Sequence, residues 1–403
     1  MEGVTMENVV VTALGISKSE KAIGYSVQEV GGDELVGANE TNFVNSLSGK
    51  VAGLQVTSST GAAGASSFMT IRGINSISGN NQPLIVVDGI PIDNSQLRSG
   101  DATASVALSN RAIDINQSEI ETVSVLKGAA ATALYGSQAG NGAIIITTKK
   151  GKLGKNKISV DFSTGMTISQ ISQTPALQTT YAQGIGSYSG PESGSGYSYG
   201  PRIDTMRFAN DAGTYKFDPN GSLVGMSDPT ATSNAAQAYD RYNFFRTSIS
   251  SRTNLAISAA NQFSSIRFSV GYQNDQGIIP NNTFQKLNFG LNATSKLSEK
   301  INLGVGVQYI NSGGVRIEQG SNTSGVMLGL TRTTPTFDNT GGFEDAVDNP
   351  SAYTLADGTQ RNYRGGGGYD NPYWTINKNP LEDNVNRIIA NMSLTYDPFV
   401  CHF

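Results

Sequence analysis

The stretch Phe284-Gln-Lys-Leu-Asn-Phe-Gly-Leu-Asn-Ala-Thr-Ser-Lys296 decides the fold class, because apolar and polar residues alternate along it. A period of two is typical of a β-strand with one apolar and one polar face. The apolar set is taken as Phe284, Leu287, Phe289, Leu291 and Ala293, and the polar set as Lys286, Asn288, Asn292 and Thr294. The stretch therefore predicts a strand that separates an apolar from a polar environment.

Five further segments of about ten residues alternate in the same way. They are 158–168, marked by Ile158, Val160, Phe162, Met166 and Ile168, followed by 253–260, 265–273, 300–310 and 387–396. The connections between the six predicted strands are 170–252, 261–264, 274–283, 297–299 and 311–386. Long loops at one edge and tight turns at the other are typical of a transmembrane β-barrel meander.

The region before these strands predicts a compact α+β domain of short elements. A helical period runs through Val44, Leu47, Val51 and Leu54, with Asn42 or Thr41 as a possible N-cap and Gly53 near its end. A second, small-residue helix is predicted over Ala129–Tyr135. Strands are predicted over 54–57, 68–74, 84–88, 121–127 and 143–149, and residues 1–40 are interpreted as extended and polar apart from Val9, Val10 and Val11.

Composition excludes several classes of function. The 28 basic and 32 acidic residues give a net charge of −4, so the chain lacks the basic character of a nucleic-acid-binding protein. The single cysteine, Cys401, and the single histidine, His402, exclude an intrachain disulfide, a Cys/His zinc site and a Ser-His-Asp triad. No metal, cofactor or enzymatic activity is predicted; the loop carboxylates Asp338, Glu344, Asp345 and Asp348 lack the apolar framework of a glycosidase site.

Several motifs carry a family resemblance. Leu84-Ile-Val-Val-Asp-Gly-Ile-Pro-Ile-Asp93, Ile120-Glu-Thr-Val-Ser-Val-Leu-Lys-Gly128 and Ala133-Leu-Tyr-Gly-Ser-Gln-Ala-Gly-Asn-Gly-Ala-Ile-Ile-Ile-Thr-Thr-Lys149 resemble the plug domain of TonB-dependent outer-membrane receptors. Gly49-Lys-Val-Ala-Gly-Leu-Gln-Val56, together with Ile71-Arg-Gly-Ile74, resembles the SusC/RagA subfamily of nutrient importers. Glu7-Asn-Val-Val-Val-Thr-Ala-Leu-Gly15 resembles the stretch that carries that subfamily's TonB box.

The resemblance implies an α+β plug domain followed by the first strands of an antiparallel transmembrane β-barrel, about six of an expected 22. The implied division is an extended N-terminal segment (1–41), the plug (42–150), a hinge (151–157) and a partial barrel (158–403). The family also has a signal peptide and usually a small carboxypeptidase-regulatory-like domain, and Phe399-Val-Cys-His-Phe403 departs from the preceding pattern. We therefore expect a chain truncated at both ends, with a frameshift after about Pro398.

The implied function is import of a nutrient across the outer membrane. By resemblance, TonB, with ExbB and ExbD, would displace the plug, and a SusD-like surface lipoprotein would deliver a glycan fragment, with a peptide left open as the ligand. Two alternatives remain at this stage. One is a plug-bearing fragment that does not transport, and the other is a β-rich surface adhesin.

Three groups of candidate site residues follow. Val9, Val10, Val11, Thr12 and Ala13 are a candidate TonB box, or else simply a first plug strand. Arg72 and Glu121 are candidates for an ion pair between plug and barrel, or else solvated charges. Candidate ligand contacts, which could instead pack the loops or form the aromatic girdle, are Tyr188, Tyr197, Tyr199, Tyr369, Tyr373 and Trp374.

Overall fold

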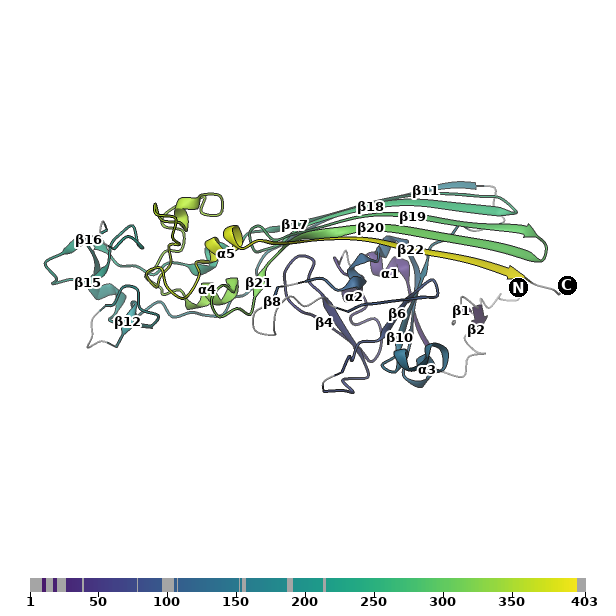
Figure 1. Cartoon of the computed structure of the whole chain (residues 1–403), viewed down its shortest axis with the longest axis horizontal. Helices are drawn as coiled ribbons and strands as arrows, with labels where there is room; N and C mark the ends of the chain where they lie inside the picture. Colours follow the sequence, from purple (N-terminus) through teal and green to yellow (C-terminus); the bar gives the residue numbers. More distant parts are fainter. Residues whose placement is uncertain are drawn as a thin grey trace, which may run out of the picture.

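The structure is a computed structural model of the 403-residue chain. It describes residues 9–11, 17–19, 27–37, 40–77, 79–95, 105–106, 108–151, 153, 157–186, 191–212 and 215–396. A long curved sheet, here the barrel sheet, arches over a smaller domain, here the plug (described residues between 27 and 151) (Figure 1). The segments 170–247 and 317–380, here the loop region, gather beyond one end of the barrel sheet.

The barrel sheet has six antiparallel strands in the order β11-β17-β18-β19-β20-β22. This confirms the six predicted strands and their meander. Four strands reach further toward the loop region than predicted; β20, for example, ends at Arg316 rather than at 310. Ladder hydrogen bonds continue there without requiring one apolar face, so alternation is a poor guide to these ends. The strands are Lys157–Ser169 (β11), Ser248–Ala260 (β17), Ser264–Gln276 (β18), Thr283–Ser298 (β19), Ile301–Arg316 (β20) and Leu381–Tyr396 (β22).

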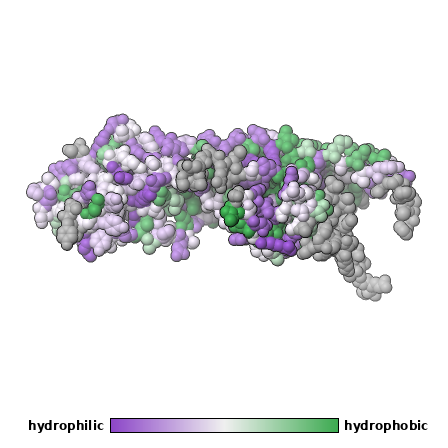
Figure 2. Space-filling view, turned by 60° about the horizontal axis from the view of Figure 1, so that its bottom comes forward, coloured by the Kyte–Doolittle hydropathy of each residue, from purple (hydrophilic) through white to green (hydrophobic). Residues whose placement is uncertain are grey.

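The two faces of the barrel sheet differ in chemistry. The outer face carries exposed apolar side chains such as Phe162 and Met392, which are 65% and 73% exposed. Figure 2 shows hydrophobic residues concentrated over the barrel-sheet end of the molecule, whereas the loop end is mostly hydrophilic. The inner face buries polar residues, among them Arg252, Arg267 and Lys286. This is the pattern of a sheet with lipid on one side and protein on the other.

Phe284 was assigned to the wrong face of its strand. It is in phase with Lys286 and Asn288, and like them it is buried on the inner side of β19. The guanidinium of Arg316 lies 5.3 Å from the centre of its ring. Phe284 is therefore part of the contact between barrel sheet and plug rather than of the outer apolar surface.

The plug is built on a five-stranded sheet in the order β3-β9-β10-β6-β7. β10 pairs in parallel with β6, and the other pairs are antiparallel. β3 lies before residue 42, the predicted start of the plug, yet it pairs with β9 along its length. The strands are Val27–Gly31 (β3), Leu84–Val87 (β6), Ile90–Ile92 (β7), Ile120–Leu126 (β9) and Ala143–Thr148 (β10).

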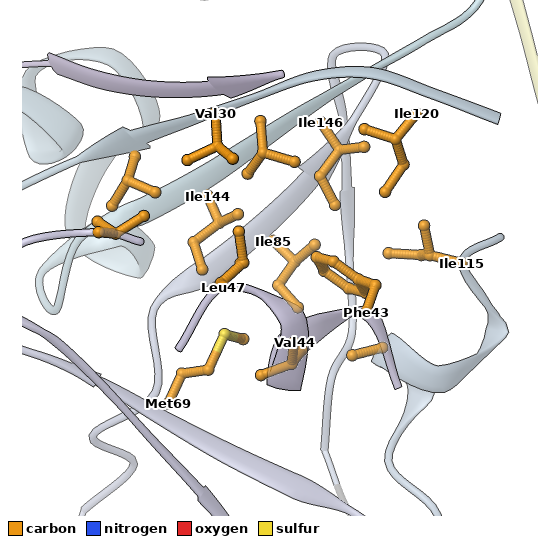
Figure 3. Close-up of a cluster of buried hydrophobic side chains, with 14 of the residues drawn as sticks. Val30, Phe43, Val44, Leu47, Met69, Ile85, Ile115, Ile120, Ile144 and Ile146 are labelled. Carbon is orange, nitrogen blue, oxygen red and sulfur yellow. The ribbon is translucent and has the colours of Figure 1, made fainter. Parts of the chain in front are cut away.

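The core of the plug forms between this sheet and the chain segments packed on it. Branched side chains of the sheet, including Val30, Ile85 and Ile144, meet Phe43 and Leu47 (Figure 3). Met69 closes the cluster from the hairpin of β4 (Leu54–Ser58) and β5 (Ser67–Ile71).

The predicted helix through residues 44–54 is wrong. Only α2 (Phe43–Ser46) forms, capped as predicted by Asn42, whose side chain accepts a hydrogen bond from the Val44 N–H at 3.2 Å. The chain then turns, because Gly49 and Gly53 both adopt φ 75°, a left-handed conformation that ends a helix. The second predicted helix, α3 (Ala129–Tyr135), is confirmed with the same bounds.

The remaining elements are short. In the N-terminal part they are β1 (Val9–Val11), β2 (Ser17–Ser19), α1 (Gly32–Val36), β8 (Ser105–Val106), η3 (Arg111–Asp114), η4 (Gln117–Glu119) and η5 (Gly136–Ala139). In the loop region they are β12 (Gly184–Ile185), β13 (Ser198–Tyr199), η6 (Ile203–Thr205), β14 (Met206–Ala209), β15 (Leu223–Gly225), β16 (Ala231–Ala235), η7 (Arg241–Phe244), β21 (Glu318–Gln319), α4 (Val326–Arg332), η8 (Pro350–Ala352) and α5 (Pro372–Lys378). Among the described residues, every helix is too short and too polar to cross a bilayer.

A glycine substitution tests how tightly α1 packs on the plug sheet. A Cβ on Gly32 would overlap the backbone carbonyl of Ile120 at the start of β9. We expect Gly32→Ala to destabilise the plug by about 1–3 kcal/mol, measured as faster hydrogen exchange of the β3 and β9 amides. Gly37→Ala is the control, since Gly37 has φ −60° and open space around it. Equal exchange in the two variants would contradict the close packing.

Candidate functional site

The plug meets the barrel sheet along residues 110–119, which include η3 and η4. The Lys286 ammonium donates hydrogen bonds to the carbonyl oxygens of Ile113 and Ile115, at 2.8 and 3.4 Å. Ser312 on β20 donates to the Asp114 carboxylate at 2.8 Å. This irregular segment therefore offers its backbone and side chains to polar groups on three or more barrel strands.

A buried ion pair lies at the centre of this contact. Arg267 on β18 lies 3.2 Å from the Glu119 carboxylate, and the two side chains are only 7% and 10% exposed. The same guanidinium lies 2.9 Å from Asp161 on β11. One arginine thus links the plug to two strands of the barrel sheet.

Further polar contacts lie between this ion pair and the loop end of the sheet. Arg252 donates to the Gln117 side chain at 2.8 Å and also to the Glu40 carbonyl. Near the loop region, Arg316 donates to Asp383 at 2.6 and 3.1 Å and to the Ala63 carbonyl at 3.2 Å. The plug is therefore held mainly through hydrogen bonds and ion pairs.

The residues predicted for a plug–barrel ion pair occupy other places. Arg72 lies on an exposed turn after β5, with φ 61°. Glu121 is half-buried and lines a cleft together with Asp33, Lys149 and Arg267. Two ion pairs that join the parts are formed by Glu119 with Arg267 and by Asp114 with Arg387 on β22, and the sequence analysis selected neither pair. A charged residue on the polar side of a predicted barrel strand, such as Arg267, was the available signal.

The candidate TonB box is described only in part. Val9–Val11 form β1, which pairs antiparallel with β2, Val10 lying opposite Lys18. Thr12 and Ala13 lie outside the described residues.

The predicted aromatic contacts in the loops separate into two kinds. Tyr197 and Tyr199 are 55% and 71% exposed, whereas Tyr373 is 4% exposed, with its ring 5.0 Å from that of Phe244. Trp374 is half-buried, edge-on to Tyr353. Tyr188 lies outside the described residues. Tyr373 thus belongs to the apolar core of the loop region, while Tyr197 and Tyr199 lie on its surface.

Tyr369 lies where the two long loops meet. The guanidinium carbons of Arg332 and Arg364 lie 4.5 and 4.7 Å from the centre of its ring, and Tyr363 stacks on it at 6.4 Å. From the first loop, Gln183 donates to the Tyr363 carbonyl at 2.6 Å. The structure thereby brings together residues from 183–197 and 361–369.

A buried arginine gives the loop region a fixed shape. Arg361, 3% exposed, donates to the carbonyl oxygens of Ala352 and Asp338, both at 2.7 Å, and its guanidinium lies 5.0 Å from the Phe337 ring. Burial lowers the pKa of Arg361, and the neighbouring Asp218 and Asp338 act against that shift. Burial likewise raises the pKa of Asp218, which two hydrogen bonds from Asn220 and the charge of Arg361 oppose. Such a network holds loop segments distant in sequence at fixed positions.

Comparison with known proteins agrees with this geometry. The family model for the TonB-dependent receptor plug domain matches residues 19–143. TonB-dependent receptor SusC of Bacteroides thetaiotaomicron is 29% identical over 93% of this chain, and TonB-dependent receptor P26 of Formosa agariphila is 27% identical over 87%. Residues 19–143 are thus a TonB-dependent receptor plug domain, and the chain as a whole is similar to SusC-type TonB-dependent receptors.

Solved structures extend the likeness to the whole fold. The RagAB peptide importer in its open-open state gives a TM-score of 0.66 over 97% of this chain and 41% of that chain, at 21% identity. The closed-closed state gives a TM-score of 0.63. A plug domain followed by the first strands of an antiparallel barrel, the predicted fold class, is thus confirmed.

The matched relatives are much longer than this chain. It spans 32% of the length of SusC and 31% of that of P26.

The buried Arg267–Glu119 pair yields a prediction for this TonB-dependent receptor plug. Glu119→Gln leaves a desolvated guanidinium with only one carboxylate partner, so we expect segment 110–119 to lose about 2–4 kcal/mol of protection against local opening. Hydrogen exchange of the protein in its membrane measures this. In a double-mutant cycle, Arg267→Gln should reduce the protection of segment 110–119 much less in the Glu119→Gln background than in the wild type.

Asp204→Asn is the control, since the Arg202–Asp204 pair is more than half exposed on both sides. We expect it to leave the protection of segment 110–119 unchanged, since exposed ion pairs contribute little to stability. Additive effects of the Glu119 and Arg267 substitutions would show that the pair contributes nothing to seating the plug.

Proposed function

We propose that the protein imports oligosaccharides across the outer membrane by a TonB-dependent mechanism. The observation that carries this proposal is a plug seated by buried polar contacts against the inner face of a sheet whose outer face is apolar. A domain placed in this way blocks the lumen of a barrel and must move or rearrange for a solute to pass. The plug-domain match and the similarity to SusC-type TonB-dependent receptors support the same function.

The N-terminal segment is the proposed contact with TonB, which supplies the energy for transport. We assign the TonB box to Val9–Ala13, of which Val9–Val11 form a strand paired only with β2 among the described residues. A short strand with a free edge can add to the sheet of a partner protein through main-chain hydrogen bonds. TonB, energised by ExbB and ExbD, would pull on this segment and thereby act on the plug that follows it.

The proposed organisation places each part in a membrane context. The segment before β3 carries the TonB box, and the plug runs from β3 to residue 150, because β3 pairs with β9 and so extends the plug beyond its predicted start at residue 42. Residues 151–157 are a hinge, and 158–403 are barrel strands in the outer membrane with their long loops outside the cell. The edges of β11 and β22 must be paired in the working protein, because each unpaired backbone group in hydrocarbon costs several kcal/mol. The proposed role is transport rather than bond chemistry, so no catalytic residue is assigned.

An oligosaccharide is the proposed cargo, delivered by a SusD-like surface lipoprotein. Tyr197 and Tyr199 present exposed aromatic surface in the loop region, and aromatic faces with polar rims suit the stacking of sugar rings. The second candidate is peptide import, because the solved structures with a similar fold are those of a peptide importer. A surface adhesin is a weaker candidate, since it has no use for a plug.

Substitution in the TonB box tests the proposal. Proline at position 10 cannot donate a backbone hydrogen bond, so Val10→Pro should abolish uptake of labelled oligosaccharide and growth on it. Val10→Thr keeps the N–H and β-branching and should retain most of the uptake.

Both variants are introduced into the protein as its host expresses it, and surface labelling checks that each reaches the membrane. Unchanged uptake in Val10→Pro would contradict TonB-driven import. TonB-dependent uptake of peptides but of no oligosaccharide would decide for the second candidate.

A further inference from the structure

Two cations of the loop region converge on one aromatic ring. Arg332, the last residue of α4, and Arg364 each have the guanidinium within 5 Å of the centre of the Tyr369 ring. In the described part of the loop region the ion pairs are Arg202–Asp204 and Lys216–Asp357, so neither of these two arginines is neutralised by a carboxylate. Both guanidinium groups carry a positive charge on the same ring, so an anion bound beside that ring would be attracted by both.

Unused hydrogen-bond donors lie beside these cations. The Tyr363 hydroxyl and the Asn362 side-chain N–H₂ are buried and have no hydrogen-bond partner among the described residues. The Asn362 side-chain oxygen already accepts hydrogen bonds from the backbone N–H groups of Arg364 and Gly366, each at 3.0 Å. Burial raises the pKa of Tyr363 to about 12, and the charges of Arg364 and Arg332 act in the opposite direction, which shows that both reach this hydroxyl electrostatically. The cluster is thus rich in donors and poor in acceptors.

The backbone around the cluster keeps the guanidinium groups in place. Residues Gly365, Gly366 and Gly368 adopt φ 68°, 85° and 81°, a tight turn suited to glycine. From the other loop, a Cβ on Gly196 would lie 3.4 Å from the Arg364 guanidinium, so the two loops pack closely there. Arg332 also donates one N–H to the Asn322 carbonyl at 3.0 Å. Stacking on Tyr369 occupies a face of each guanidinium, so the remaining N–H groups can donate to a planar or tetrahedral anion.

We propose that Arg332 and Arg364 form a subsite for the acidic group of an oligosaccharide, a carboxylate or a sulfate, with Tyr369 as the positioning residue between them. The inference rests on the proposed import of oligosaccharides and narrows their class to acidic ones. The exposed ring of Tyr197, next to Gly196, provides apolar surface for the sugar that carries the charge. A sugar acid carries the anionic group and the ring surface in a single sugar unit of the oligosaccharide.

Binding by the purified protein, measured calorimetrically, tests the subsite with matched probes. The probes are tetragalacturonate, its neutral methyl ester, a sulfated carrageenan tetrasaccharide, its desulfated form and an acidic tetrapeptide. At least one acidic sugar should bind about 10-fold or more tightly than its neutral counterpart, and the preference should weaken with salt. A difference in affinity between tetragalacturonate and its methyl ester would indicate a carboxylate subsite, and one between the sulfated and desulfated tetrasaccharides would indicate a sulfate subsite.

Substitutions then assign the preference to the two arginines. Arg332→Gln and Arg364→Gln should each lower affinity for the acidic sugar about 10-fold or more, and change affinity for the neutral form less than about 2-fold. Arg364→Lys, which keeps the charge but loses the planar fork, should fall between wild type and Arg364→Gln. Arg202→Gln, an exposed arginine of the same loop region, is the matched control and should change neither affinity.

The outcomes separate this inference from the proposed function. Equal affinity for acidic and neutral sugars, equal losses for both in the arginine variants, or preference for the acidic peptide would each overturn the subsite. If uptake of neutral sugars still depends on the TonB box, oligosaccharide import stands although the subsite fails. If no sugar is imported at all, the proposed function itself fails.

Discussion

The rest of the structure depends on the burial of cationic side chains on the inner face of the barrel sheet. Arg252, Arg267 and Lys286 are each less than 10% exposed, and a desolvated cation is tolerable only with acceptors at hand. The opposite face of the same strands is apolar, so these side chains cannot turn outward without shifting the register. The plug supplies the acceptors: the Glu119 carboxylate, and the carbonyl oxygens of Glu40 and Ile113. The position of the plug is therefore set by the chemistry of the barrel.

The irregular conformation of residues 110–119 is what allows this segment to serve as the contact. A regular strand or helix uses its carbonyl groups internally, whereas short 3-10 turns leave many of them free for the barrel. Polar contacts also suit a domain that has to move. Each neutral hydrogen bond exchanged for one to water changes the free energy by only about 0.5–1.5 kcal/mol. Water entering the lumen can replace such contacts one at a time, in contrast to the simultaneous exposure of a large apolar interface.

Single strands and single helical turns could be predicted from local patterns in the sequence. Contacts between segments distant in the sequence could not. Alternation located all six barrel strands, and small residues followed by Gly136 located α3. The period through Val44, Leu47 and Val51 predicted one long helix, which is wrong. These side chains do enter one core, but from α2 and the turns after it. Glu119 was overlooked for a related reason. Its importance comes from Arg267, 148 residues further on, and a partner at that distance leaves no local pattern.

The loop region is packed against the end of the barrel sheet and is held in a fixed shape. The turn after β18 contributes Ile279 to an apolar cluster with Phe244 and Tyr373, so both long loops pack on the end of the barrel sheet. From the second loop, Arg361 donates a hydrogen bond to the Phe217 carbonyl of the first at 3.3 Å, in addition to its two bonds within its own loop. Because the loop framework is fixed in this way, Arg332 and Arg364 keep their positions over Tyr369 without a ligand. A site organised before binding loses little conformational entropy when it binds, so charge selection at the loops can occur before the plug moves.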